Sequence, residues 1–325
     1  MERNGPVSSE ITGYAASVFV YLHSVTSDQG YLEAADRAAS FLVRRAWDPA
    51  SKSMPFELDP PEFTYFFDCG IVVRGLVAAW RAIGDQEFLD VATALGASMA
   101  TDFAHEDGGF HPVLSLPAKQ PAALNGGRWS VAPGCYQLKA ALAWRDLEEA
   151  TGDSSFAANY ARAVEDALQG HGSFLPGHPD RLRVMDRLHA FLYFLEGLLP
   201  RAGERRCDEA ITGGILLVER ALREIAPQFE RSDVYAQLLR LRLHADSAGV
   251  APLDYEAAWY EADRLAGFQA EDPDPRIDGG FYFGRMGGKM LPHVNPVSTA
   301  FALHALALWE QRCNDGTSVP PDVLV

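Results

Sequence analysis

Hydrophobic and polar positions along this chain form two kinds of segment that alternate. The first kind is apolar at nearly every position and recurs at intervals of about 50 to 65 residues, the mark of a repeat architecture. These apolar segments are residues 15–22, 71–80, 138–144, 190–199, 236–243 and 300–309. The second kind has one apolar stripe and many charged residues: 31–42, 87–103, 155–168, 207–225 and 255–268. A helix that is apolar on most sides must be enclosed, whereas a one-striped helix covers a surface. The pattern therefore predicts inner helices that alternate with outer helices.

The stretches between these segments predict loops, and no Gly/Ser linker or low-complexity tract divides the chain. The long loops 49–64, 105–130 and 271–294 are rich in Gly and aromatic residues, so we expect them to be ordered and functional. Small hairpins or turns are predicted at residues 107–111 and 278–283. We expect a single helical domain over residues 1–313. Residues 314–325 predict an irregular C-terminal tail, so the sixth outer helix is either missing or supplied by this short tail.

The inner helices open in a similar way, with polar or aromatic residues before a small and apolar segment. An example is Asp278-Gly279-Gly280-Phe281 followed by Ser298-Thr299-Ala300-Phe301-Ala302-Leu303. With the alternation of helices, these openings make nearly the whole chain resemble the (α/α)6 toroid superfamily. That superfamily includes six-hairpin glycosidases, polysaccharide lyases, sugar 2-epimerases and terpenoid cyclases. The Asp-rich DxDD run of squalene-type cyclases is absent from the sequence. The resemblance implies an all-α fold, an (α/α)6-type toroid of alternating inner and outer helices with a few short hairpins at one end. It also implies a substrate cleft at the N-terminal ends of the inner helices.

Composition excludes several classes of function. The chain has 28 basic and 44 acidic residues and a net charge of −16, which disfavours nucleic acid or an anionic membrane as a partner. The four cysteines are scattered without a CxxC pair, and no HxxxH or HExxH spacing occurs, so we expect no metal and no cofactor. The N-terminus lacks an apolar signal core and no run reaches the roughly 18 apolar residues of a membrane span. We therefore expect a cytoplasmic protein.

Three aspartates at inner-helix openings are candidates for acid–base catalysis: Asp68, Asp186 and Asp233. Asp186 and Asp233 are expected on neighbouring inner helices, whose axes would stand roughly 8–10 Å apart. Two carboxylates at roughly 6.5–9.5 Å suit an inverting glycosidase. The alternative interpretation is that each aspartate caps its helix or forms a structural ion pair.

Basic residues near the same openings are candidates for binding an anionic substrate. Arginine presents a planar fork that matches a carboxylate, so Arg187, Arg231 and Arg285 are expected to grip an acidic substituent of the substrate. The alternative is that they pair with neighbouring Asp and Glu residues.

Aromatic and histidine side chains complete the predicted site. Tyrosine and tryptophan rings offer apolar faces to sugars, and the candidates are Tyr65, Trp129, Tyr136, Tyr235 and Tyr282. When the inner helices are superposed, His189 falls close to the level of Tyr136 and Tyr235, and is a further substrate-binding candidate. His293 is the histidine best placed for proton transfer, and Asn295 before Pro296 suits either a helix cap or a ligand contact. The aromatic residues Phe66, Tyr193 and Phe281, and also His304, are expected in the core.

The sequence leads to three hypotheses about function. The first is a carbohydrate-active enzyme, most simply a glycoside hydrolase that uses carboxylate acid–base catalysis on an anionic, uronate-type oligosaccharide. The second is a uronate lyase or a sugar epimerase or isomerase with a Tyr or His base and an Arg or Asn that holds the substrate carboxylate. The base would come from Tyr65, Tyr136, Tyr235 or His293. The third is a non-catalytic toroid that binds a glycan or a protein. In each enzyme hypothesis the partner is a small molecule or an oligosaccharide.

Overall fold

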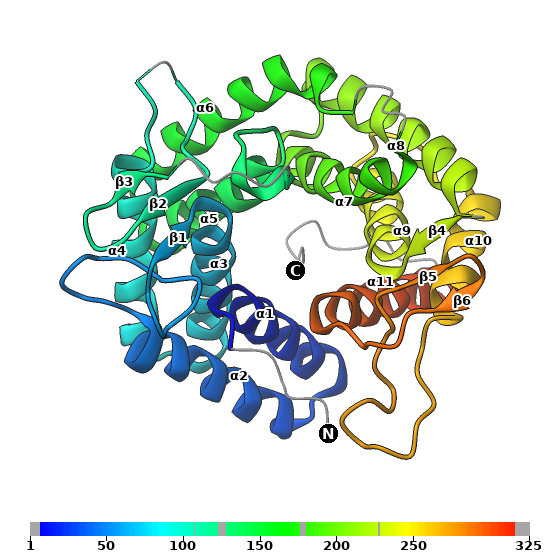
Figure 1. Ribbon diagram of the computed structural model, residues 1–325, viewed down its shortest axis with the longest axis horizontal. Coiled ribbons are helices and arrows are strands. Elements are labelled where there is room, and N and C mark those ends of the chain that lie inside the picture. The colour runs from blue at the N-terminus through cyan, green and yellow to red at the C-terminus, as the bar shows by residue number, and fades with distance from the viewer. Residues whose placement is uncertain (1–6, 107, 123–127, 176–179, 227, 316–325) are drawn as a thin grey trace. The chain divides into compact units, whose positions relative to one another are not determined.

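The computed structural model describes residues 7–106, 108–122, 128–175, 180–226 and 228–315. The chain divides into two compact units, Met1–Ala167 and Leu168–Val325. Each unit is built from helices with one small sheet (Figure 1).

The first unit consists of three pairs of consecutive helices. The helices are α1 (Ser9–Thr26), α2 (Gln29–Phe41), α3 (Phe66–Ile83), α4 (Gln86–Asp102), α5 (Gln137–Thr151) and α6 (Ser154–Gly170), with a π-helical turn η1 (Leu42–Ala46) and a 3-10 turn η2 (Trp129–Val131). In Figure 1, α1, α3 and α5 lie side by side, and α2 and α4 flank them on one side. This is the alternation that the hydrophobic pattern predicts. Helix α3 shows why, because its buried residues run almost without interruption from Phe66 to Val77.

Two glycines allow the inner helices of the first unit to touch. A Cβ atom at Gly75 would lie 2.4 Å from the backbone oxygen of Gly13, so α1 and α3 meet backbone to backbone. A Cβ atom at Gly70 would lie 2.5 Å from the Cβ of Ala140, which brings α5 against α3 in the same way. Side chains larger than glycine would push these helices apart. The first turns of α1 and α3 are therefore held close to each other.

A three-stranded antiparallel sheet leads into α3. Strand β1 (Phe63–Tyr65) pairs with β2 (Val113–Ser115), with Thr64 opposite Leu114, and β2 pairs with β3 (Gln120–Pro121). Because β1 ends at Tyr65 and α3 begins at Phe66, the sheet fixes where the first turn of α3 lies.

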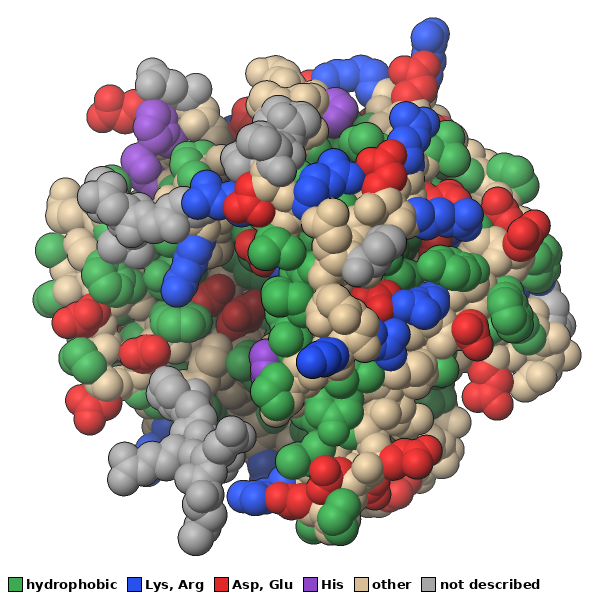
Figure 2. Space-filling model, turned by 45° about the vertical axis from the view of Figure 1, so that its right-hand side comes forward, with side chains coloured by type: hydrophobic (Ala, Val, Ile, Leu, Met, Phe, Trp, Pro, Cys, Tyr) green, Lys and Arg blue, Asp and Glu red, His purple; other side chains and the backbone are tan. Residues whose placement is uncertain are grey.

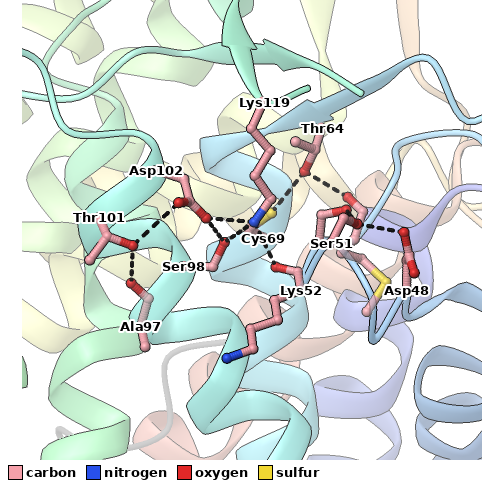
Figure 3. Close-up of polar contacts among 12 residues, drawn as sticks. Asp48, Ser51, Lys52, Thr64, Cys69, Ala97, Ser98, Thr101, Asp102 and Lys119 are labelled. Atoms are coloured by element: carbon pink, nitrogen blue, oxygen red, sulfur yellow. Dashed lines mark hydrogen bonds and ion pairs between the residues drawn. The ribbon is translucent and has the colours of Figure 1, made fainter. Parts of the chain in front are cut away.

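Polar contacts anchor this sheet to the helices (Figure 3). The Thr64 hydroxyl donates to the carbonyl of Met54 at 2.8 Å and lies 3.3 Å from the Cys69 sulfur, which ties β1 to the first turn of α3. The Lys119 ammonium joins the β2–β3 hairpin to α4 by donating to Asp102 at 2.6 Å and to the Ser98 hydroxyl at 3.1 Å. The sheet is therefore tied to the start of α3 through β1 and to α4 through the β2–β3 hairpin.

The second unit repeats the scheme with five helices among the residues that the structure describes. They are α7 (Arg181–Leu198), α8 (Arg205–Ile225), α9 (Ser232–Ser247), α10 (Tyr255–Ala266) and α11 (Pro296–Asp315), with 3-10 turns η3 (His171–Ser173) and η4 (Leu199–Arg201). Helix α9 packs against α7, α10 and α11, and its residues from Ser232 to Ala245 are all buried. The sheet of this unit consists of β4 (Phe229–Arg231), β5 (Gly284–Met286) and β6 (Lys289–Met290), in that order. Strand β4 runs directly into α9, as β1 runs into α3.

The predicted short hairpins are present but lie a few residues further along the chain. The hairpins β2–β3 and β5–β6 follow the predicted segments, whose own described residues form turns and isolated bridges such as Ala104↔Phe110 and Tyr282↔Val294. Helix α11 continues to Asp315, and the rest of the expected tail lies outside the described residues. The core positions expected for Phe66, Tyr193, Phe281 and His304 are confirmed, since each is at least 99% buried.

Candidate functional site

Asp68 is a buried carboxyl group in the first turn of α3. The residue is 6% exposed, and within the described part of the chain its Oδ2 atom is buried without a hydrogen-bond partner. Burial raises the pKa of Asp68 well above its usual value, and the negative charge of Glu10 raises it further. Both effects penalise the ionised form. Asp68 is therefore held as a neutral acid that can donate a proton.

Glu10, in the first turn of α1, is the charged neighbour of Asp68. Burial raises the pKa of Glu10 to about 7. The sequence analysis did not select Glu10, although it stands in the opening Ser9-Glu10 of the first inner helix. Glu10 and Asp68 occupy equivalent positions on their two helices. Glu10 precedes Gly13 by three residues and Asp68 precedes Ile71 by three, and a Cβ at Gly13 would lie 3.0 Å from the Ile71 backbone oxygen.

Aromatic side chains surround this carboxyl pair. The negative charge of Asp68 raises the pKa of both Tyr65 and Tyr136, after the larger effect of burial, so three predicted site residues come together here. Trp129 is half-buried and meets the Tyr136 ring edge-on, with 4.8 Å between ring centres. Tyr136 itself is 1% exposed and its hydroxyl donates to the carbonyl of Ala132 at 2.9 Å. Tyr65 and Trp129 are thus the rings that retain an accessible face.

A second cluster, in the second unit, joins Asp186, Arg231 and Asp233. Arg231 Nε and Nη2 donate to the two oxygens of Asp233 at 3.0 and 2.5 Å, and Nη1 donates to Asp186 at 2.5 Å. Burial alone would raise the pKa of Asp233, but the Arg231 charge and hydrogen bonds prevail and lower it. The ionised form of Asp233 is therefore favoured, and Asp233 is the structural partner of Arg231, whereas the Asp186 side chain remains 51% exposed.

His189 lies beside this ion cluster. Its Nδ1 atom is 2.6 Å from Gln237 Oε1 and 3.5 Å from Asp233 Oδ2. Burial lowers the pKa of His189, which favours the neutral imidazole. When Nδ1 carries the proton and donates it to Gln237, Nε2 is the acceptor that could remove a proton from a substrate. The sequence analysis missed Gln237, because a glutamine in the middle of a helix gives no signal of its own.

Two further predicted residues belong to a buried cluster at β4. Glu230 is 2% exposed and accepts hydrogen bonds from the Tyr235 hydroxyl at 3.0 Å, from Arg264 at 2.6 Å and from Arg285 at 3.1 Å. Tyr235 is fully buried, and burial raises its pKa. Tyr235 and Arg285 therefore serve as hydrogen-bond partners of the buried Glu230 side chain. Arg187 lies apart from this cluster, with its guanidinium 4.9 Å from the centre of the Phe174 ring.

The remaining predicted residues, Tyr282, His293 and Asn295, lie close in sequence to β5 or to the start of α11. His293 is exposed and stacks on Phe283 with 5.4 Å between ring centres, and the Arg231 guanidinium also lies 4.6 Å from the centre of that ring. Asn295 Oδ1 accepts from the Ser298 backbone at 2.9 Å, which is the helix-cap role. The Tyr282 carbonyl accepts from the Ser232 hydroxyl at 2.6 Å, and its side chain is half-exposed.

Charged side chains of opposite sign lie close together in the described part of the chain. Figure 2 shows basic side chains beside acidic ones on the face in view, as the ion pairs above lead one to expect. No group of three or more His, Cys, Asp or Glu side chains within the described ranges is arranged to hold a metal ion. Within the same ranges, no helix has both the length and the apolar character that crossing a membrane requires.

Comparison with known proteins gives a clear result for the fold. No model of a known protein family matches the sequence, and no curated protein matches it significantly. Among solved structures, cellobiose 2-epimerase from Spirochaeta thermophila superposes with a TM-score of 0.72 at 14% identity, over 95% of this chain and 88% of that one. D-mannose isomerase gives 0.69 at 10% identity, over 93% and 87%. An α-amylase from Clostridium perfringens gives 0.61 at 11% identity, over 93% and 87%.

These proteins share one architecture, and the match extends over almost the whole of this chain. The identities are too low to indicate more than the fold. The predicted fold class is confirmed: the chain has an all-α fold of the (α/α)6-toroid type.

Proposed function

We propose that this protein is a carbohydrate-active enzyme, and specifically a glycoside hydrolase in which Asp68 is the general acid. The observation that carries the proposal is the state of Asp68: a buried carboxyl with an unpartnered Oδ2 and a raised pKa. Hydrolysis of a glycosidic bond requires a proton donor for the leaving oxygen, and burial is how a carboxyl group remains protonated near neutral pH. The toroid proteins named above, an epimerase, an isomerase and an amylase, support carbohydrate as the substrate class.

The rings beside Asp68 support the same substrate class. Tyr65 and Trp129 present faces on which the apolar side of a sugar ring can stack, and Tyr65 adds a hydroxyl group. The arginines considered for an anionic sugar support this part of the hypothesis less, because Arg231 and Arg285 are already bound by carboxylates. The proposed enzyme is therefore a hydrolase that holds its sugar by ring stacking. A uronate-containing sugar is the alternative substrate to compare with a neutral one.

A turnover screen tests the proposal. The purified protein is incubated with matched neutral and uronate-containing oligosaccharides, and the products are identified by mass. Hydrolysis adds one water across the two products, and Asp68→Asn should reduce the rate by about 100-fold or more, the contribution of general acid catalysis. Products with a new ultraviolet absorbance and no added water would identify a lyase instead. Full activity of Asp68→Asn would refute the assignment.

A second candidate function rests on His189. Its Nδ1 is engaged by Gln237 and approached by Asp233, so a neutral imidazole with a defined orientation is held in the second unit. Such a base could remove the proton beside a sugar carbonyl, as an epimerase or isomerase requires. Two of the three structural neighbours described above carry that type of name.

Solvent exchange separates the two candidates. In D2O, an epimerase or isomerase that works through His189 would form a product isomer carrying one solvent deuterium, without cleavage. His189→Gln should abolish that exchange, while a hydrolase centred on Asp68 would keep its cleavage activity in this variant. Binding of an oligosaccharide without turnover would instead indicate a glycan-binding toroid.

A further inference from the structure

Helices α1 and α3 bring two carboxyl groups together at their first turns. The close approach of the Gly13 and Gly75 backbones holds the two helices in contact, and Gly13 lies at the level of Ile71. One turn towards the N-terminus from that contact are Glu10 on α1 and Asp68 on α3. A helix N-terminus alone would not identify a site. Here the buried Asp68 Oδ2 without a partner is a second and independent observation.

The groups around Asp68 leave Glu10 as its electrostatic partner. From β1 and α5 the phenols of Tyr65 and Tyr136 face it, and on α3 itself the next residue is Cys69, whose thiol contacts Thr64. These groups are neutral near pH 7, and burial raises the pKa of the Cys69 thiol to about 12. Glu10 is the group whose charge acts on Asp68. Two carboxyl groups that interact electrostatically in this way cannot both ionise without a cost, so they titrate as a pair.

We propose that Glu10 and Asp68 form a carboxyl pair that shares one proton, with Glu10 as the positioning residue that keeps Asp68 in its acid form. The inference rests on the proposed function for its role in catalysis, but the pairing itself does not. In the pair, Glu10 is partly buried and carries the charge, while the more deeply buried Asp68 retains the proton. The contact between α1 and α3 sets the distance between the two carboxyl groups.

Titration of the two carboxyl groups tests the pairing without any assay of activity. Protein labelled with 13C at the Asp and Glu side-chain carboxyls is titrated by NMR, and the two signals are assigned by their loss in Asp68→Asn and Glu10→Gln. Because Asp68 titrates in the presence of the Glu10 charge, Glu10→Gln should lower the titration midpoint of Asp68 by about one pH unit or more, whereas Asp68→Asn should change that of Glu10 much less, since Asp68 is still protonated when Glu10 ionises. Glu10→Asp, which keeps a carboxyl group at the site, should give a smaller shift.

The matched control is Glu33→Gln, an exposed position on α2 in the same unit, which should leave both midpoints unchanged. Circular dichroism verifies that each variant is folded. If Glu10→Gln leaves the Asp68 midpoint at its wild-type value, the pairing is refuted.

The pH dependence of hydrolysis tests the catalytic role. If Asp68 donates the proton, activity declines on the alkaline side as Asp68 ionises, and Glu10→Gln should move that limb to lower pH by the same shift that NMR records. A lowered Asp68 midpoint in Glu10→Gln together with a fully active Asp68→Asn would confirm the pair and refute the hydrolase assignment. An alkaline limb that stays fixed while the Asp68 midpoint moves would refute the positioning role of Glu10.

Discussion

Arg231 binds Asp233 through two parallel hydrogen bonds, from Nε at 3.0 Å and from Nη2 at 2.5 Å, and both side chains are at least 94% buried. The arginine ends β4 and the aspartate lies in the first turn of α9, so the pair bridges the junction of strand and helix. This arrangement makes the ion pair part of the framework of the second unit. It also keeps Asp233 ionised, which is unsuitable for a general acid.

Removal of the arginine should therefore destabilise the fold strongly. Arg231→Met would leave the Asp233 carboxylate buried without its partner, and breaking a buried pair in this way costs about 3–5 kcal/mol. Asp186 binds the same arginine from a half-exposed position, so Asp186→Asn should cost less than about 1 kcal/mol. Urea unfolding monitored by circular dichroism measures both. Equal losses in the two variants would contradict the assignment of Asp233 as the structural partner.

The raised pKa of Asp68 should make the protein less stable as pH increases. Above the ordinary pKa of an aspartate, the unfolded chain has lost this proton while the native state keeps it, so the native state binds more protons and stability falls with pH. Asp68→Asn removes this penalty. The variant should gain on the order of 1 kcal/mol or more over the wild type at pH 8, and little at pH 4. Unfolding curves at the two pH values measure this difference in stability. A variant that is no more stable than the wild type at pH 8 would contradict the assignment of Asp68 as a buried, neutral acid.

The contact between α3 and α5 should be intolerant of a single methyl group. Gly70→Ala would place its Cβ 2.5 Å from Ala140 Cβ and should destabilise the protein by about 1–3 kcal/mol. Gly213 on α8 is the matched control, because a Cβ there meets nothing within 4 Å. Gly213→Ala should be neutral or stabilise by up to about 1 kcal/mol. Thermal unfolding of the two variants distinguishes a packing effect from a general effect of helix propensity.

Most of the fold could be predicted from the sequence because the helices are long and their apolar patterns differ. Helix α3 is buried along most of its length and reads as a nearly continuous apolar segment, whereas α8 has one buried stripe. Strands β1 and β4 were not predicted, since three residues carry too little pattern to be recognised. Both owe their conformation to pairing with strands more than 40 residues away in the sequence.

The candidate site was predictable only in part. Asp68 stood out because an acidic residue precedes a strongly apolar segment. Glu10 did not, because a glutamate in the first turn of a helix is commonly explained by the helix dipole. What distinguishes Glu10 is its position beside Asp68 of α3, which depends on the contact of Gly13 and Gly75 and is visible only in three dimensions. The pairing of Arg231 with Asp233 was likewise foreseen only as a general alternative, since the sequence does not show which acid a given arginine meets.

The most direct test of Asp68 as the general acid compares leaving groups. For a substrate found in the turnover screen, kcat/KM is measured on the natural glycoside and on the dinitrophenyl glycoside of the same sugar, with the wild type and Asp68→Asn. A dinitrophenolate leaves without a proton, so the variant should lose about 100-fold or more on the natural substrate but less than about 10-fold on the activated one. Equal losses on both substrates, or no loss on the natural one, would contradict the account.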